Sequence, residues 1–318
     1  GRGGHGTDVR VVDVEAAWRE SHEDLPGLFY QGGVEVPQGW EEHGTAVLGI
    51  MAGVDNGLGV HGIADQASYG AQSIFPSGVA AAIFTAATAA GEGGIVVLEV
   101  QAPGPWGAAN CTCNWGQCGL IPMEYWQAEF DAIALATANC VIVVEAGANG
   151  SSDLDNPIYL GAFNRGVRDS GAIFVAASLK DWRMRICFSN HGSRMDLHAW
   201  GELIVTTGYG YLWAGLGPDQ YYTNSFGGTS GATPIVAGAA AALQGAQKGY
   251  GRPPLAPENM LHVLRHGATP QIGTGIIGPM PNLRNSVSLL PYNPRVCSGK
   301  GKPQVPNLPQ YPDENEPQ

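Results

Sequence analysis

The sequence predicts an α/β protein of a single domain, built on a doubly wound, mainly parallel sheet that is flanked by helices. Two observations predict this fold class. Short apolar runs alternate along the 318 residues with longer Ala-rich segments, as buried parallel strands joined by crossover helices do. The composition, with 44% hydrophobic residues, 14% charged residues and 47 glycines, is that of a compact, turn-rich domain.

The expected elements follow in order along the chain. Apolar runs bounded by turn residues are expected to be strands at residues 9–12, 95–100, 141–145, 172–176 and 203–206. Helices are expected at about residues 45–53, 77–90, 123–139, 229–248 and 257–266. In an open sheet of this kind, sites form in the loops beyond the carboxyl ends of the strands. Functional residues are therefore expected just after strands or at helix starts.

The composition changes near residue 290. Beyond this point the chain is rich in Pro, Asn, Gln and acidic residues and ends KPQVPNLPQYPDENEPQ, which is too polar to fold by itself. We therefore expect residues 1–290 to form the folded domain and residues 291–318 to form a Pro-rich tail.

Charge and hydropathy exclude some partners. The net charge is −12, from 28 acidic and 16 basic residues, whereas binding to a phosphate backbone needs a clustered basic face. The longest apolar stretches, near residues 80–90 and 235–243, are too short to span about 30 Å of hydrocarbon. No nucleic-acid or membrane partner is expected. Because no segment looks like a partner-binding helix, a monomer is expected.

The cysteines favour an exported protein. The chain has six of them, an even number, which suits disulfides in an extracellular compartment. It begins Gly1-Arg2 without a Met or a basic-then-apolar leader, as a processed chain does. Cys111, Cys113 and Cys118 lie in one loop, at a spacing that also suits zinc. No His is near them in the sequence, so disulfides are the preferred interpretation.

Three polar residues occupy the positions that this fold reserves for function. Asp13 follows the apolar run Val9–Val12, His43 stands where a helix can begin, and Ser230 stands at the start of a long Ala-rich helix. A Ser hydroxyl becomes nucleophilic when a neutral imidazole takes its proton, and a carboxylate fixes the tautomer of that imidazole. Among Asp8, Asp13 and Glu15, we choose Asp13 as the carboxylate because it closes the apolar strand.

These residues lie in blocks that resemble those of the subtilase family. The blocks are Val11-Val12-Asp13, His43-Gly44-Thr45 and Gly228-Thr229-Ser230-Gly231-Ala232-Thr233-Pro234, in the family's order. The resemblance extends from about residue 8 to residue 270. It implies a subtilisin-like catalytic domain and a serine endopeptidase that works through an acyl-enzyme intermediate. It also implies a catalytic triad of Asp13, His43 and Ser230.

A fourth block is similar to the one in which the family has an Asn side chain that binds the oxyanion. It stands here as Glu145-Ala146-Gly147-Ala148-Asn149-Gly150. The resemblance therefore assigns the oxyanion role to Asn149. One departure is that Ala148 occupies a position at which the family usually has Gly.

Two further segments are similar to binding segments of the family. Residues 98–103 resemble the strand that pairs with the substrate backbone, so Glu99, Val100 and Gln101 are expected to bind substrate. Glu145 is expected near the same pocket, where the two acids would favour basic or polar side chains. The alternative is that both acids are capped or face solvent.

The run Asp55-Asn56-Gly57-Leu58-Gly59-Val60 resembles the family's calcium-binding loop. The resemblance implies Ca²⁺ ligands at Asn56, Leu58 and Val60, a set of oxygen donors suited to this cation. An ordinary Asn-Gly turn is the alternative. The chemistry itself requires no cofactor.

Other functions fit less well. An α/β-hydrolase needs Gly-x-Ser-x-Gly and the order Ser, acid, His, whereas Ala232 stands at the second Gly position and the order here is reversed. A metallopeptidase needs a motif such as His-Glu-x-x-His, whereas Pro26 stands four residues after His22, where the second His would be. The remaining alternative is a catalytically weak or inactive subtilase-like binding protein. The sequence therefore favours an enzyme that acts on proteins or peptides.

Overall fold

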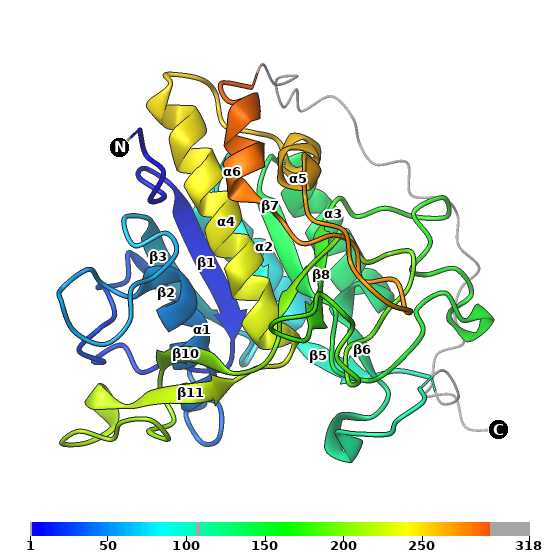
Figure 1. The fold of residues 1–318 in the computed structure, drawn as a ribbon, viewed down its shortest axis with the longest axis horizontal. Coiled ribbons are helices and arrows are strands. Elements are labelled where there is room, and N and C mark those ends of the chain that lie inside the picture. Colours follow the sequence, from blue (N-terminus) through cyan, green and yellow to red (C-terminus); the bar gives the residue numbers. More distant parts are fainter. Residues whose placement is uncertain (1, 106–108, 293–318) are drawn as a thin grey trace.

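The fold is a single domain around a seven-stranded parallel sheet (Figure 1). The computed structural model describes residues 2–105 and 109–292. From one edge of the sheet to the other, the strands are β2 (Tyr30–Gly32), β3 (Ser68–Ser73), β1 (Arg10–Glu15), β4 (Ile95–Leu98), β7 (Ile142–Ala146), β8 (Ile173–Ser178) and β9 (Leu197–Trp200). The predicted fold class is confirmed.

Helices cover both faces of this sheet. One face packs on α1 (Glu41–Ala52), α4 (Thr229–Gly249) and α5 (Pro257–Arg265), and the other packs on α2 (Val79–Ala90) and α3 (Gln127–Ala138). In Figure 1, α4 crosses in front of the sheet and α2 lies behind it. Each face has its own apolar core. A short helix, α6 (Leu283–Ser286), packs against α5.

Strand alternation decides which side chains each core receives. In β1, Val11 belongs to the core under α1 and α4, whereas Val12 and Val14 belong to the core under α2 and α3. Because successive side chains of a strand point to opposite faces, Asp13 and Glu15 share the face of Val11. The two acids of β1 therefore lie on the side of the sheet that α1 and α4 cover.

Two antiparallel ribbons lie outside the main sheet. One joins β10 (Ile204–Thr207) to β11 (Tyr222–Phe226), and the other joins β5 (Gln101–Pro103) to β6 (Leu120–Pro122). The hydroxyls of Thr206 and Thr207 donate to the carbonyls of Ala46 and Thr45 at 2.7 and 2.6 Å. The first ribbon therefore holds the N-terminal part of α1. Short 3₁₀ turns stand at Trp115–Gln117, Met123–Tyr125, Pro157–Tyr159, Pro218–Gln220 and Val287–Leu289.

The predicted elements correspond to observed ones, with shifts at their ends. The predicted strand 203–206 is real but lies in the β10–β11 ribbon and not in the main sheet. The strand β3 was not predicted, because its sequence Ser-Tyr-Gly-Ala-Gln-Ser is no apolar run. Within the described ranges, no helix has the length and hydropathy to cross a membrane. Most of the predicted tail, residues 293–318, lies outside the described residues.

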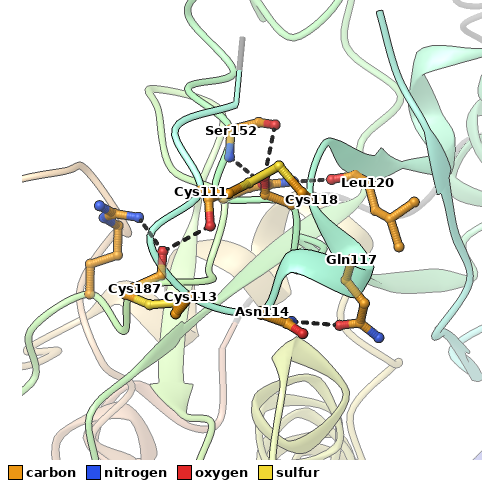
Figure 2. The surroundings of a disulfide bond; sticks show 12 residues. Cys111, Cys113, Asn114, Gln117, Cys118, Leu120, Ser152 and Cys187 are labelled. Atoms are coloured by element: carbon orange, nitrogen blue, oxygen red, sulfur yellow. Dashed lines mark hydrogen bonds between the residues drawn. A yellow bond between two sulfur atoms is a disulfide. The ribbon is translucent and has the colours of Figure 1, made fainter. Parts of the chain in front are cut away.

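Disulfides close the loop before β6 (Figure 2). Cys111 bonds to Cys118 within the loop, and Cys113 bonds to Cys187, which follows β8 in the sequence. The prediction of disulfides is therefore confirmed, and the three thiols of this loop are not free to bind zinc. Cys140 is also disulfide-bonded, whereas Cys297 lies outside the described residues.

Candidate active site

A cleft of about 1190 Å³ opens at the carboxyl ends of β1 and β4. After β1 the chain adds β2 and β3 on one side of that strand, and from β4 onward it builds the other side. This is a topological switch point, where open α/β sheets bind their ligands. The polar side chains that line the cleft include Glu15, His43, Glu99, Gln101, Asn149 and Ser230.

His43 is paired with Glu15. Its Nδ1 lies 2.8 Å from each of the two Glu15 carboxylate oxygens, so Nδ1 is the protonated nitrogen and Nε2 is left as the acceptor. The Phe226 ring meets the imidazole edge to face at a centroid distance of 5.5 Å. The imidazole is therefore held in one orientation and one tautomer.

The prediction that Asp13 is the partner of His43 is wrong. Asp13 Oδ2 instead accepts a hydrogen bond of 2.7 Å from the Trp18 indole, and Oδ1 has no partner among the described residues. The strand does not end at residue 13, because β1 continues to pair with β3 as far as Glu15. Asp13 therefore lies one pleat farther from the strand end, and Glu15 reaches the start of α1.

Burial shifts the pKa of each of these groups toward its neutral form, whereas the hydrogen bond from His43 Nδ1 favours the carboxylate form of Glu15. Burial raises the pKa of Glu15 well above its usual range, and burial followed by the charge of Glu15 raises the pKa of Asp13. Burial lowers the pKa of His43, against the opposing effect of Glu99 and Asp13. A neutral imidazole is the form that can accept a proton from a Ser hydroxyl.

The residues that follow His43 fix the start of α1. A Cβ atom on Gly44 would lie 2.3 Å from the Ala17 carbonyl oxygen and 2.7 Å from the Trp18 ring, so this position requires Gly. The Thr45 hydroxyl donates to the Glu41 carbonyl at 2.6 Å and accepts from the Arg19 N–H at 2.9 Å. Local packing against the segment after β1 thus places His43 beside Glu15.

Ser230 is the second residue of α4 and is 6% exposed. Gly228 precedes the helix with φ 84° and ψ 178°, a conformation that favours Gly. The first N–H groups of a helix have no partners within it, and the helix dipole adds positive potential there. Negative charge on an oxygen bound at Ser230 would therefore be stabilised.

Asn149 presents its amide nitrogen to the same place. Its Oδ1 accepts from the Thr229 N–H at 2.8 Å and from the Thr229 hydroxyl at 3.0 Å. Because these donors need an oxygen, the orientation of the amide is fixed and Nδ2 remains as a donor that lines the cleft. The backbone N–H of Asn149 donates to Gln101 Oε1 at 2.8 Å. Gln101 therefore positions Asn149.

The departure at position 148 does not displace Asn149. Ala148 has φ 66° and is fully buried, so it adopts the left-handed conformation that a Gly would take without strain. The Asn190 N–H donates to its carbonyl at 3.0 Å. The backbone before Asn149 is thus held in place at some cost to stability.

Of the four predicted substrate-binding residues, Glu99, Val100 and Gln101 line the cleft. The prediction for Glu145 is wrong, because Glu145 shares the face of Val143, on the opposite side of the sheet. There its Oε1 accepts a hydrogen bond of 2.9 Å from the Glu124 N–H. The Glu124 carboxylate in turn pairs with the buried Arg194 at 2.9 Å. Glu145 therefore belongs to the interior.

The residues predicted to bind calcium lie in one loop, where the side chain of Asn56 forms hydrogen bonds. Asn56 Oδ1 accepts from the Leu58 N–H at 2.8 Å, and Asn56 Nδ2 donates to Asp24 at 3.1 Å. The other Asp24 oxygen accepts from the Val60 N–H at 2.7 Å. This arrangement favours the Asn-Gly turn over the calcium loop, and the chelator experiment below decides between the two.

Comparison with known proteins shows the family to which the sequence is similar. Residues 30–288 match the model of the Subtilase family. Subtilisin DY of Bacillus licheniformis is 29% identical over 250 residues, which are 76% of this chain and 78% of that protein. Alkaline elastase YaB of Bacillus sp. strain YaB is 28% identical over 284 residues, 87% of this chain and 65% of that protein.

Solved structures show the same fold. The patellamide maturation protease PatA superposes with a TM-score of 0.65 at 23% identity, over 90% of this chain and 97% of that chain. A cold adapted subtilisin-like serine proteinase gives a TM-score of 0.58 at 20% identity, over 87% and 91%. The arrangement of the sheet and its helices is therefore that of subtilisin-like proteins.

The roles of the two acids in β1 can be separated by Ser230 reactivity. We expect Glu15→Gln to slow labelling of Ser230 by an organophosphonate by about 10³-fold or more, because an amide no longer fixes the Nδ1–H tautomer. Asp13→Asn is the matched control, since an Asn oxygen can still accept from Trp18, and it should stay within about tenfold of the wild type. The reverse order of effects would restore Asp13 to the triad.

The loop at residues 55–60 predicts the response to a chelator. We expect EDTA to leave the melting temperature unchanged, because Asp24 already accepts hydrogen bonds from Asn56 and Val60. The measurement is a thermal melt with EDTA and with added Ca²⁺. A melting temperature that falls with EDTA and recovers with Ca²⁺, but not with Mg²⁺, would establish the calcium site.

Proposed function

This chain belongs to the subtilase family of serine proteases, and we propose that it is an endopeptidase with Ser230 as nucleophile, His43 as general base and Glu15 as the third member of its triad. The observation that carries the proposal is the pairing of His43 with Glu15 in a cleft that also contains Ser230 and Asn149. A triad is defined by geometry and roles, so Glu can take the place of Asp.

The mechanism follows from these positions. His43 Nε2 takes the proton of the Ser230 hydroxyl as the oxygen attacks the peptide carbonyl, and the Glu15 carboxylate stabilises the imidazolium that forms. The negative charge on the carbonyl oxygen is stabilised by Asn149 Nδ2 and by the backbone N–H of Ser230 at the start of α4. His43 then returns its proton to the leaving amine, and water releases the acyl group from Ser230.

The substrate is proposed to be an extended protein or peptide segment. Val100 and Gln101, the first residue of β5, line the cleft, and a peptide can pair there with the backbone as an added strand. The disulfides support an extracellular enzyme, because such bonds persist in oxidising compartments. We further propose that the enzyme acts as a monomer. It would need no cofactor and would have no nucleic-acid or membrane partner.

Hydrolysis of unfolded casein tests the activity directly. We expect wild-type protein to cleave casein and a serine-directed inhibitor to abolish the cleavage, with Ser230→Ala inactive. The circular dichroism spectra of the wild type and of Ser230→Ala should be the same, because the substitution leaves the fold unchanged. Folded wild-type protein that neither cleaves casein nor reacts with the inhibitor, from mildly acidic to mildly alkaline pH, would leave the catalytically inactive binding protein as the function.

Replacement of Asn149 tests the oxyanion site. We expect Asn149→Ala to lower kcat by about 10²- to 10³-fold, or roughly 3 to 4 kcal/mol, with little change in KM, because the donor acts on the charge of the transition state. Thr229→Ser is the control, since it keeps both donors to Asn149 Oδ1. An unchanged kcat in Asn149→Ala would remove Asn149 from the mechanism.

A further inference from the structure

Glu99 lies directly beside Glu15 at the end of the neighbouring strand. The strands β1 and β4 pair in parallel, with Val14 opposite Leu98, and the Glu99 N–H donates to the Val14 carbonyl at 3.4 Å. Val97 belongs to the core under α1 and α4, and alternation places Glu99 on that same face. Glu15 and Glu99 therefore stand side by side toward His43 and Ser230.

Glu99 is buried without a hydrogen-bond partner. It is 6% exposed, and neither of its carboxylate oxygens has a partner among the described residues. It lines the cleft together with Ser230, whose hydroxyl lowers the pKa of Glu99 but forms no hydrogen bond of normal geometry with it. A buried polar group without a partner costs free energy. Because Glu99 lines the cleft, a group bound in the cleft could supply the missing partner.

The surroundings of Glu99 are acidic. Glu15 and Asp13 face it from β1, His43 faces it from α1 and Ser230 faces it from α4. Glu202 lies on the wall of the same cleft, and the described residues that line the cleft include no Lys or Arg. Two carboxyl groups at one site cannot both ionise readily.

The proton is favoured on Glu99, because Glu15 accepts a hydrogen bond from His43 Nδ1 whereas Glu99 has no such donor. Burial raises its pKa well above the usual range, and the charges of Glu15 and Asp13 raise it further, while His43 and Ser230 act in the opposite direction. Below this raised pKa the carboxyl group is neutral and can donate a hydrogen bond. Above it, a negative charge would stand next to the developing oxyanion and oppose its formation.

We propose that Glu99 is a further substrate-binding residue of this site, which donates a hydrogen bond from its neutral carboxyl group to a peptide carbonyl bound beside Ser230, and whose ionisation ends turnover. The proposal rests on the endopeptidase function. In this role Glu99 is neutral. Selection of basic substrate side chains would instead require an ionised Glu99. It predicts an enzyme whose activity falls as the pH rises through the pKa of Glu99.

The test is the pH dependence of kcat/KM for a peptide in wild type, Glu99→Gln and Glu99→Met. Gln keeps a hydrogen-bond donor but has no titratable group. Met is of similar length and has neither a donor nor a titratable group. We expect the wild type to lose activity on the alkaline side. Both variants should lack this loss, and Glu99→Met should have a kcat/KM about tenfold below that of Glu99→Gln through the lost hydrogen bond. The acidic limb, set by His43, should remain in all three.

Two results would overturn the proposal. One is a pH profile of kcat/KM for Glu99→Gln that has the same shape as the wild-type profile, whatever the magnitude of kcat/KM. The other is a loss in Glu99→Gln that is confined to substrates with Lys or Arg at the cleavage position, which would show an ionised Glu99 that selects basic side chains.

A measurement without substrate separates this proposal from the proposed function. Infrared spectra of the resting protein at neutral pH should contain a carboxylic acid band that is absent from Glu99→Gln. If no such band exists, the Glu99 proposal fails even when casein is cleaved. If the band exists but Ser230→Ala and wild type are equally inactive on casein, the endopeptidase function fails, and so does the role of Glu99 in turnover.

Discussion

The contact between Glu15 and His43 is the interaction on which the rest of the site depends. It joins the last residue of β1 to the first turn of α1, so the sheet and a helix must keep a fixed spacing for it to form. The packing of Trp18 on Gly44, the Thr45 hydrogen bonds and the β10 hydroxyls all maintain that spacing. A neutral His with one protonated nitrogen is the chemical result.

The same constraint concentrates acids at one place. Parallel pairing in register and strand alternation bring Asp13, Glu15 and Glu99 to a single face near one imidazole, without a Lys or Arg among the described residues that line the cleft. Such a group cannot carry three charges, so burial and mutual repulsion keep protons on part of it. The electrostatics of the site therefore depend on how protons are distributed within this group as much as on the triad.

The oxyanion side of the cleft is built by different means. Thr229 holds the oxygen of the Asn149 amide, and Gln101 holds its backbone N–H, so one short segment is fixed from α4 and from β5. Ala148 accepts an unfavourable backbone conformation at the same place. The disulfide between Cys113 and Cys187 joins two segments that line the cleft, where Asn114 and Gln117 also lie (Figure 2). Local strain and covalent links are here combined to keep donors in position.

The sequence by itself determined the class of fold, most of the helices and the positions of His43 and Ser230, because short-range patterns carry that information: apolar runs, and Gly residues before helix starts. Only the tertiary structure decided which acid meets His43. Residues 13 and 15 point to the same face, and the choice depended on how far β3 extends the pairing of β1. It also placed Glu145 in the interior, because the face of β7 on which a residue lies depends on which helices pack there. How far two strands pair, and which helices cover each face of the sheet, depend on contacts between segments that are distant in the sequence. No local pattern in the chain specifies such contacts.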